Sequence, residues 1–229
     1  MNALRPFDVA ANLSAVQAQV DAALNSAGRD AGAAQLIAVS KTKPVEEIRP
    51  VLAAGQVLFG ENRVQEAQGK WPDLRQAFPD AEVHLIGPLQ TNKVKQAVAL
   101  FDAIQTVDRP KLARALATEM ARTDRFLDCF VQINVGEEEQ KAGVAPTEAD
   151  DFITMCWDEL KLPVRGLMCI PPADEEPAPY FALMNRIAER NGLTELSMGM
   201  SADYENAILN GSTYLRLGTA ILGNRSSTI

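Results

Sequence analysis

Lys41 follows Ser40 and the apolar run LIAV at residues 36–39, and it precedes TKP at residues 42–44. An uninterrupted apolar run of this length is typical of a parallel strand that is buried on both faces. A lysine at the C-terminal end of such a strand could supply the amine of a Schiff base or anchor a phosphate group. A solvated lysine in a loop would give the same pattern, because most lysines lie on protein surfaces.

Hydroxyl side chains stand at similar positions later in the chain. Ser201 follows an apolar run at 195–199, while Gly218 and Thr219 follow a run at 213–217. Hydroxyl groups and free backbone amides at such positions bind a phosphate dianion well. Ser201 could equally be an ordinary helix N-cap and Gly218 an ordinary turn residue, so both interpretations stay open for these residues alone.

The histidine and cysteine counts limit the chemistry further. His84 is the only histidine, and the three cysteines, Cys129, Cys156 and Cys169, are odd in number and widely spaced. We therefore expect no metal site, no disulfide framework and no hydrolase that depends on histidine. His84 is expected to be a hydrogen-bonded pocket or core residue rather than a general base.

Candidate strands and helices alternate along the chain and must position these residues. Apolar runs typical of strands lie near 35–40, 56–59, 82–86, 103–107, 127–135, 163–170, 195–199 and 213–217. Helical patterns lie near 8–27, 45–54, 61–77, 91–100, 109–123, 147–160, 177–190 and 202–210. The first helix precedes all the strands, so it is an addition to the alternating pattern.

Eight strands alternating with helices predict an α/β fold, a single (β/α)8 TIM-type barrel with an extra N-terminal helix at about 8–27. We expect residues 1–229 to form one domain, with the barrel at about 35–225. An open, doubly wound sheet is the alternative, but no Gly-x-Gly-x-x-Gly follows any strand. Active sites of such barrels lie at the C-terminal strand ends, so Lys41 and the two hydroxyls would meet there.

Composition argues against several classes of partner. The chain has 22 basic and 30 acidic residues, a net charge of −8, which disfavours a general nucleic-acid binder or a protein that docks on anionic membranes. No apolar run approaches the ~20 residues that span a bilayer, and no signal peptide is evident. We expect a cytoplasmic protein, and a monomer, because no strong heptad seam is present.

Seven motifs resemble those of the pyridoxal-phosphate homeostasis protein family, a group similar to the barrel domain of alanine racemases. They are AVSKTKP (38–44), FGEN (59–62), HLIGPLQTNK (84–93), QINV (132–135), RGLM (165–168), SMGMS (197–201) and RLGTAILGNR (216–225). The resemblance extends over about residues 35–225, in the order found in the family. Two positions depart from it: Arg63 stands where the family often has Tyr, and Ala202 where it often has Asp.

This resemblance implies that pyridoxal 5′-phosphate is bound as an aldimine on Lys41. It also implies phosphate contacts from Ser201, Gly218 and Thr219, with Arg216 facing the pyridine nitrogen. We expect the cofactor site to include three further residues of the matched motifs: Asn62, His84 and Met168.

The implied function is to hold and supply pyridoxal phosphate, affecting amino-acid and keto-acid balance without strong catalytic turnover. Apo forms of pyridoxal-phosphate enzymes are the possible recipients. An arginine at the pyridine nitrogen leaves that nitrogen unprotonated and weakens the ring as an electron sink. The alternative is a small pyridoxal-phosphate enzyme, a racemase or lyase of amino acids, although the resemblance implies no second, β-rich domain like that of the racemases.

Overall fold

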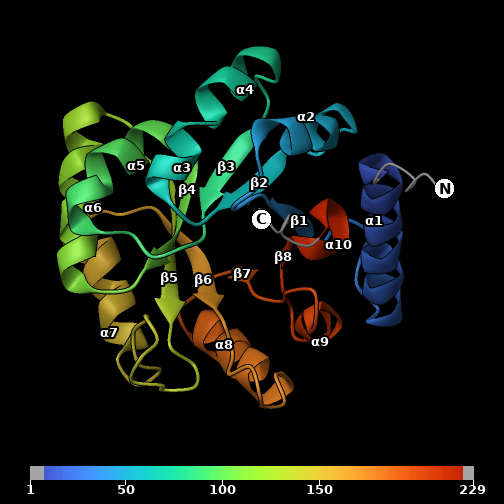
Figure 1. Cartoon of the computed structure of the whole chain (residues 1–229). Helices are drawn as coiled ribbons and strands as arrows, with labels where there is room; N and C mark the ends of the chain where they lie inside the picture. The colour runs from blue at the N-terminus through green and yellow to red at the C-terminus, as the bar shows by residue number, and fades with distance from the viewer. Residues whose placement is uncertain (1–7, 224–229) are drawn as a thin grey trace, which may run out of the picture.

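Eight parallel strands close into a barrel in the order of the sequence, and β8 pairs with β1 (Figure 1). This arrangement was obtained from a computed structural model, which describes residues 8–223. The strands are β1 (Gln35–Val39), β2 (Leu58–Glu61), β3 (Glu82–Leu85), β4 (Ala103–Val107), β5 (Asp128–Ile133), β6 (Val164–Cys169), β7 (Glu195–Ser197) and β8 (Tyr214–Leu217). The predicted barrel is confirmed; its expected end near residue 225 lies outside the described residues.

Helices connect the strands and cover the outside of the barrel (Figure 1). They are α1 (Val9–Ser26), α2 (Val45–Ala53), α3 (Val64–Gln68), α4 (Trp71–Ala77), η1 (Thr91–Lys93), α5 (Val94–Leu100), α6 (Pro110–Thr123), α7 (Ala149–Thr154), η2 (Met155–Glu159), α8 (Ala178–Arg190), α9 (Tyr204–Leu209) and α10 (Thr219–Leu222). Here η1 is a 3₁₀ turn and η2 a π-helical turn. None of these helices is both long and apolar enough to cross a bilayer.

The extra N-terminal helix α1 packs beside α10, α9 and α2 (Figure 1). Asp8 caps its start by accepting a hydrogen bond from the amide of Ala11 at 3.0 Å. Its buried residues, Leu13, Val16, Val20 and Leu24, recur at helical spacing and form one apolar face. The helix therefore covers the side of the barrel where β8 meets β1, the two strands that lead to Thr219 and Lys41.

Two apolar clusters account for the packing. The main cluster joins the outward-facing strand residues, such as Ile104 and Val131, to the helices. The second cluster contains Ala103, Phe130 and Met168, with Tyr214 packed against it. Since alternate residues of a strand face opposite sides, the second cluster occupies the interior of the barrel.

The strand register brings the predicted site residues to one end of the barrel. Ile37 of β1 pairs with Arg216 of β8, so the segments that follow these strands, which carry Lys41 and Thr219, are neighbours. Gly218 approaches β1 closely: a Cβ there would lie 3.2 Å from the carbonyl oxygen of Val39. All eight strands are parallel, so their C-terminal ends share this face.

Several helical segments differ from the sequence prediction, including the 3₁₀ turn η1 at the start of the helix expected at 91–100 and the unexpected short helix α10. The helix expected at 61–77 is two helices, α3 and α4, interrupted at Gly69 and Lys70. The last part of the helix expected at 147–160 is the π-helical turn η2. Ser201 does not open a helix: residues 201–203 form a turn, and α9 begins at Tyr204.

Candidate functional site

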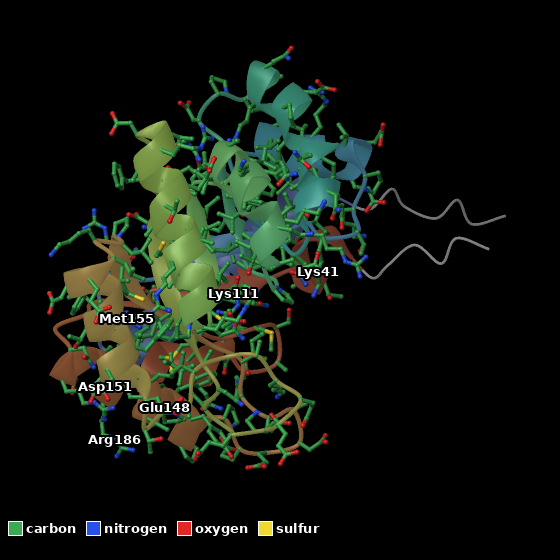
Figure 2. All side chains as sticks on the ribbon, turned by 90° about the vertical axis from the view of Figure 1, so that its left-hand side faces the viewer. Lys41, Lys111, Glu148, Asp151, Met155 and Arg186 are labelled. Carbon is green, nitrogen blue, oxygen red and sulfur yellow. The ribbon has the colours of Figure 1, made fainter. Side chains whose placement is uncertain are left out.

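Lys41 lies in a tight turn directly after β1. The turn is closed by a hydrogen bond from the amide of Lys43 to the carbonyl of Ser40 at 3.1 Å, and the amide of Ser40 bonds to the carbonyl of Gly60 at 3.0 Å. Lys41 itself is exposed, and Figure 2 shows it well away from Asp151 and Met155 on the α7–η2 side of the molecule. The arrangement fixes the backbone of this lysine and leaves its amine accessible.

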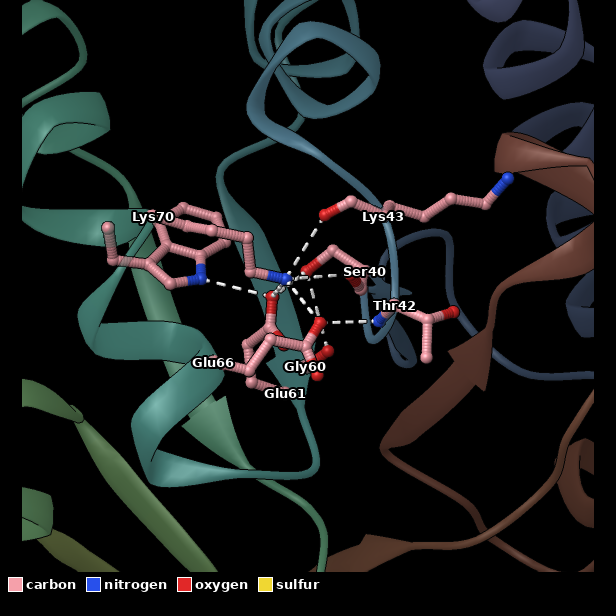
Figure 3. A network of polar contacts seen from close by, with 8 residues as sticks. Ser40, Thr42, Lys43, Gly60, Glu61, Glu66 and Lys70 are labelled. Atoms are coloured by element: carbon pink, nitrogen blue, oxygen red, sulfur yellow. Dashed lines mark hydrogen bonds and ion pairs between the residues drawn. The ribbon is translucent and has the colours of Figure 1, made fainter. Parts of the chain in front are cut away.

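Lys43, the second lysine of the turn, is buried rather than solvated. Its ammonium group pairs with Glu47 at 2.8 Å. Its side chain extends away from the contacts that hold the turn (Figure 3). Of the two lysines, Lys41 is therefore the accessible amine.

Arg216 is a buried cation on β8. Its Nη1 donates to the hydroxyl oxygen of Ser197 at 2.7 Å, and its Nη2 donates to the carbonyl of Cys169 at 2.7 Å. Burial lowers the pKa of the guanidinium from its usual value, although arginine keeps its charge in proteins. Within residues 8–223 it has no carboxylate partner, so two neutral oxygens stabilise it and further N–H groups stay free for an acceptor.

The hydrogen bonds of Arg216 continue across the barrel interior to His84. The Ser197 hydroxyl donates to Oε1 of Gln105 at 2.6 Å, and Nε2 of Gln105 lies 2.9 Å from Nδ1 of His84. Because the amide oxygen of Gln105 accepts the hydrogen bond from Ser197, the amide nitrogen of Gln105 must be the atom that faces His84. This nitrogen donates to Nδ1 of the histidine. Burial lowers the pKa of His84 to about 4, so the imidazole is neutral with its proton on Nε2.

Met168, the remaining interior residue among the predictions, is fully buried. It packs with Ala103 and Phe130 in the second apolar cluster, and the ring of Tyr214 lies 5.6 Å from that of Phe130 and 5.8 Å from that of His84. Met168 therefore supports the site by packing and lies next to Ser197 across the β6–β7 pairing.

Ser201 and Thr219 are exposed residues after β7 and β8. The turn at Ser201 is held by Asp203, whose carboxylate accepts a hydrogen bond from the amide of Met200 at 2.5 Å. The amides of Ser201, Ala202, Thr219 and Ala220 donate to no other residue that the structure describes. Two hydroxyls and four unoccupied amides on neighbouring strand ends provide the donors that a phosphate group needs.

Asn62 and Arg63 lie at the end of β2 and line a groove of about 480 Å³ together with Gln90 and Lys93. Gly87 permits this arrangement, because a Cβ on it would lie 2.4 Å from the carbonyl oxygen of Asn62. In the described part of the chain, neither Arg63 nor Lys93 forms an ion pair or a side-chain hydrogen bond. The departure at Arg63 thus adds a second positive charge to a groove that suits an anion.

Sequence reasoning brought Lys41, Arg216, Ser201 and Thr219 to one end of the barrel but missed the residues that hold them. Gln105 and Ser197 are polar residues in buried strands, and both are fully buried. A polar residue in an apolar run is the available signal, because such a group needs a buried partner. Sequence reasoning also missed the side chains that support the Lys41 turn: Glu61, Glu66 and Lys70.

The chemistry of these groups fits pyridoxal 5′-phosphate. Lys41 offers an amine for the aldehyde, and the free amides near Ser201 and Thr219 offer donors for the phosphate. Arg216 has unused N–H groups and no carboxylate partner among the described residues, which suits a neutral acceptor such as a pyridine nitrogen.

Comparisons with known proteins agree with this fit. Residues 11–226 match the family described as alanine racemase, N-terminal domain. The pyridoxal phosphate homeostasis protein of Pasteurella multocida is 39% identical over 224 residues, covering 93% of this chain and 96% of that protein. The structure of PipY from Synechococcus elongatus with PLP bound is 34% identical with a TM-score of 0.81, covering 94% of this chain and 100% of PipY.

A more distant likeness concerns the fold alone. An alanine racemase of Clostridium difficile is 15% identical with a TM-score of 0.72, over 96% of this chain and 58% of the racemase. The relatives with higher identity match over nearly their whole length, and they confirm the family that the sequence motifs indicate. The chain therefore belongs to the alanine racemase N-terminal domain family and, within it, to the pyridoxal phosphate homeostasis proteins.

Proposed function

We propose that this chain binds pyridoxal 5′-phosphate at the open end of its barrel, holds it, and supplies it to other proteins. The observation that carries the proposal is the state of Arg216, a buried cation with only neutral oxygen partners among the described residues. It lies on β8, which pairs with the strand leading to Lys41. The names of the relatives and the PLP in PipY support the same ligand.

In this proposal each site residue has a distinct role. Lys41 binds the aldehyde carbon covalently as a Schiff base, and the aldehyde oxygen leaves as water. Ser201, Gly218 and Thr219 bind the phosphate through hydroxyls and amides, and Arg216 donates to the pyridine nitrogen. Asn62 lines the mouth of the site, while His84 and Met168 support it through Gln105 and the interior apolar cluster.

The same residues favour holding the cofactor over turnover in this proposal. When bound, the cofactor supplies an electron sink for bonds at an amino-acid α-carbon. Arg216 does not give up its proton to the ring nitrogen, which weakens that sink. Burial lowers the pKa of His84 to about 4 and raises that of Tyr214 to about 12, so neither is matched to proton transfer near neutral pH.

The alternative is a weak pyridoxal-phosphate-dependent racemase or lyase, because the fold is shared with an alanine racemase. That racemase extends well beyond the matched domain, since this chain covers 58% of it. The proposed carrier and the alternative enzyme differ in a measurable outcome: the carrier transfers its cofactor to a recipient, whereas the enzyme converts an amino acid.

The test is transfer of cofactor from the loaded protein to an apo pyridoxal-phosphate enzyme. Loaded protein, freed of unbound cofactor by gel filtration, should restore the activity of the apo enzyme. Loaded protein treated with borohydride is the matched control, because reduction fixes the cofactor and should abolish transfer. Failure of untreated loaded protein to activate the enzyme would refute the supply role.

A further inference from the structure

Two charged side chains, Glu66 and Lys70, form hydrogen bonds with the backbone of the turn that carries Lys41 (Figure 3). The ammonium group of Lys70 donates to the carbonyl oxygens of Ser40 at 3.1 Å and Lys43 at 3.2 Å, the residues at the two ends of the turn. The carboxylate of Glu66 accepts a hydrogen bond from the amide of Thr42 at 2.5 Å. These contacts hold the backbone on both sides of Lys41 and leave its side chain unrestrained.

Lys70 is itself held by a buried network of charges. It pairs with Glu61 at 2.7 Å and with Glu66 at 2.8 Å, and its side chain is only 9% exposed. Glu61 is fully buried and also accepts hydrogen bonds from the Ser40 hydroxyl at 2.7 Å and from the Trp71 indole at 3.1 Å. Buried charges are costly unless they are paired and hydrogen-bonded, so this network fixes the ammonium group in one place.

The turn from Ser40 to Lys43 has an unfavourable backbone conformation at Thr42. Its φ is +63°, in the left-handed region, and it occupies the third position of the turn between Ser40 and Lys43. Glycine or asparagine is preferred there, and a β-branched residue with positive φ is a genuine outlier. Such strain persists only where the surroundings enforce it, and it is concentrated at functional sites.

We infer that Glu66 and Lys70 are positioning residues, which hold the strained Ser40–Lys43 turn in the conformation from which the Lys41 amine reaches the cofactor aldehyde. The inference rests on the proposed function and names the residues that prepare the site for covalent binding. In that step the Lys41 nitrogen bonds to the aldehyde carbon and the oxygen leaves as water. Glu66 and Lys70 exchange no atoms or protons in it; they act on the turn alone.

Three variants separate this role from a general effect on folding. Glu66→Ala removes the acceptor for the Thr42 amide at a residue whose side chain is 27% exposed, so the fold should tolerate it. Thr42→Gly removes the cost of a positive φ, and the double variant combines both changes. Asp73→Ala is the matched control, because it removes an exposed carboxylate from α4 with no hydrogen bond to the turn.

Two ligands are compared in each variant. Pyridoxal 5′-phosphate forms the covalent adduct, which is measured by its visible absorbance and by borohydride trapping at Lys41. Pyridoxine 5′-phosphate has no aldehyde and cannot form the adduct. Glu66→Ala should weaken covalent binding at least about tenfold, which corresponds to about 1.4 kcal/mol. Binding of pyridoxine phosphate should change less than about twofold, well under that 1.4 kcal/mol. In the double variant, Thr42→Gly should restore most of the covalent binding that Glu66→Ala loses. Asp73→Ala should match the wild type.

Unchanged covalent binding in Glu66→Ala would overturn the inference, as would an equal loss for both ligands. Failure of Thr42→Gly to restore covalent binding in the double variant would overturn the inference as well. The strain at Thr42 would then have no part in the loss caused by Glu66→Ala. A wild-type protein that gives no trapped adduct at Lys41 would instead refute the covalent site under the proposed function. The two failures are therefore distinguishable.

Discussion

Arg216 donates a hydrogen bond from Nη1 to the hydroxyl oxygen of Ser197 at 2.7 Å, and this contact sets the direction of every hydrogen bond beyond it. The Ser197 hydroxyl must use its own proton on Gln105, whose amide then donates to His84. A permanent cation therefore fixes the tautomer of a neutral histidine through two intervening side chains. The planar guanidinium is held at one edge by this chain and at the other by the carbonyl of Cys169.

Ser197→Ala should destabilise the protein, because it leaves polar atoms of Arg216 and Gln105 buried without their partner. Leaving such groups unsatisfied costs about 1–3 kcal/mol. Urea unfolding should report a loss of this size in the free energy of unfolding. The control is Ser26→Ala, whose exposed hydroxyl bonds to the carbonyl of Ala22 and should cost well under about 1 kcal/mol. Equal losses in the two variants would contradict the chain of hydrogen bonds.

His84 should remain neutral across the physiological pH range. Burial is the main cause that lowers its pKa from 6.5 to about 4, and the charge of Asp128 offsets this only in part. As the only histidine in the chain, it gives a ring-proton NMR signal that needs no assignment. The signal should not titrate between pH 8 and about pH 5, as expected for a histidine with a strongly depressed pKa. A midpoint near 6.5 would show that the imidazole is solvated.

The same shift affects stability. The unfolded chain binds a proton at His84 near pH 6.5 and the folded chain near pH 4, so unfolding takes up a proton between these values. The stability due to neutral His84 is fully present above pH 6.5 and is lost as the pH falls toward 4. The loss is at most about 1.4 kcal/mol per pH unit. His84→Gln should reduce this slope of unfolding free energy against pH.

The strands could be predicted from the sequence because each is a short apolar run that stays buried whatever its neighbours are. The helix prediction failed where particular residues, rather than apolar spacing, decide the backbone. Pro72 has no backbone N–H with which to continue the first helix, so the helix expected at 61–77 is interrupted at Gly69 and Lys70. The carboxylate of Asp203 accepts a hydrogen bond from the amide of Met200, three residues earlier, and α9 begins at Tyr204. Hydrophobic periodicity carries no information on either feature.

The candidate site could be predicted from the sequence only where strand topology alone determines it. Lys41, Ser201 and Thr219 follow strands, and parallel strands in a barrel end on one face, so their proximity follows from topology. The support of Arg216 by Ser197 and Gln105 depends on which residues of three different strands share one level of the barrel. That level is set by the stagger between strands, which no local pattern in the sequence encodes.

Gly87→Ala should perturb the end of β2. The added Cβ would lie 2.4 Å from the carbonyl oxygen of Asn62 and 2.7 Å from its Cα, and both are backbone atoms that cannot move freely. Overpacking of this kind costs about 1–3 kcal/mol. Gly69→Ala is the control, because its nearest contact would be an ordinary 3.6 Å. Thermal unfolding should show a clear loss for the first variant and no loss for the second.

The phosphate donors should account for much of the affinity for pyridoxal phosphate. Ser201→Ala and Thr219→Val each remove one hydrogen bond to a charged group, which is worth about 1.5–3 kcal/mol. A loss of this size lowers the affinity by roughly tenfold or more. Pyridoxal, which lacks the phosphate, should bind far more weakly than the phosphate ester in the wild type. Equal affinity for the two compounds in a titration would remove these residues from the phosphate site.

Loaded protein should bind amino acids without converting them. Turnover at the α-carbon needs a proton acceptor with a pKa near the working pH and a strong electron sink. Among the described residues, His84 is held neutral by its low pKa, Tyr214 lies at the start of β8 and its pKa is about 12, and Arg216 weakens the sink. Each L-amino acid should therefore perturb the visible spectrum of the loaded protein, while chiral analysis after incubation finds no product beyond that of free pyridoxal phosphate. Lys41→Ala is the decisive control: racemisation or elimination that exceeds the free cofactor and disappears in this variant would establish the enzyme in place of the carrier.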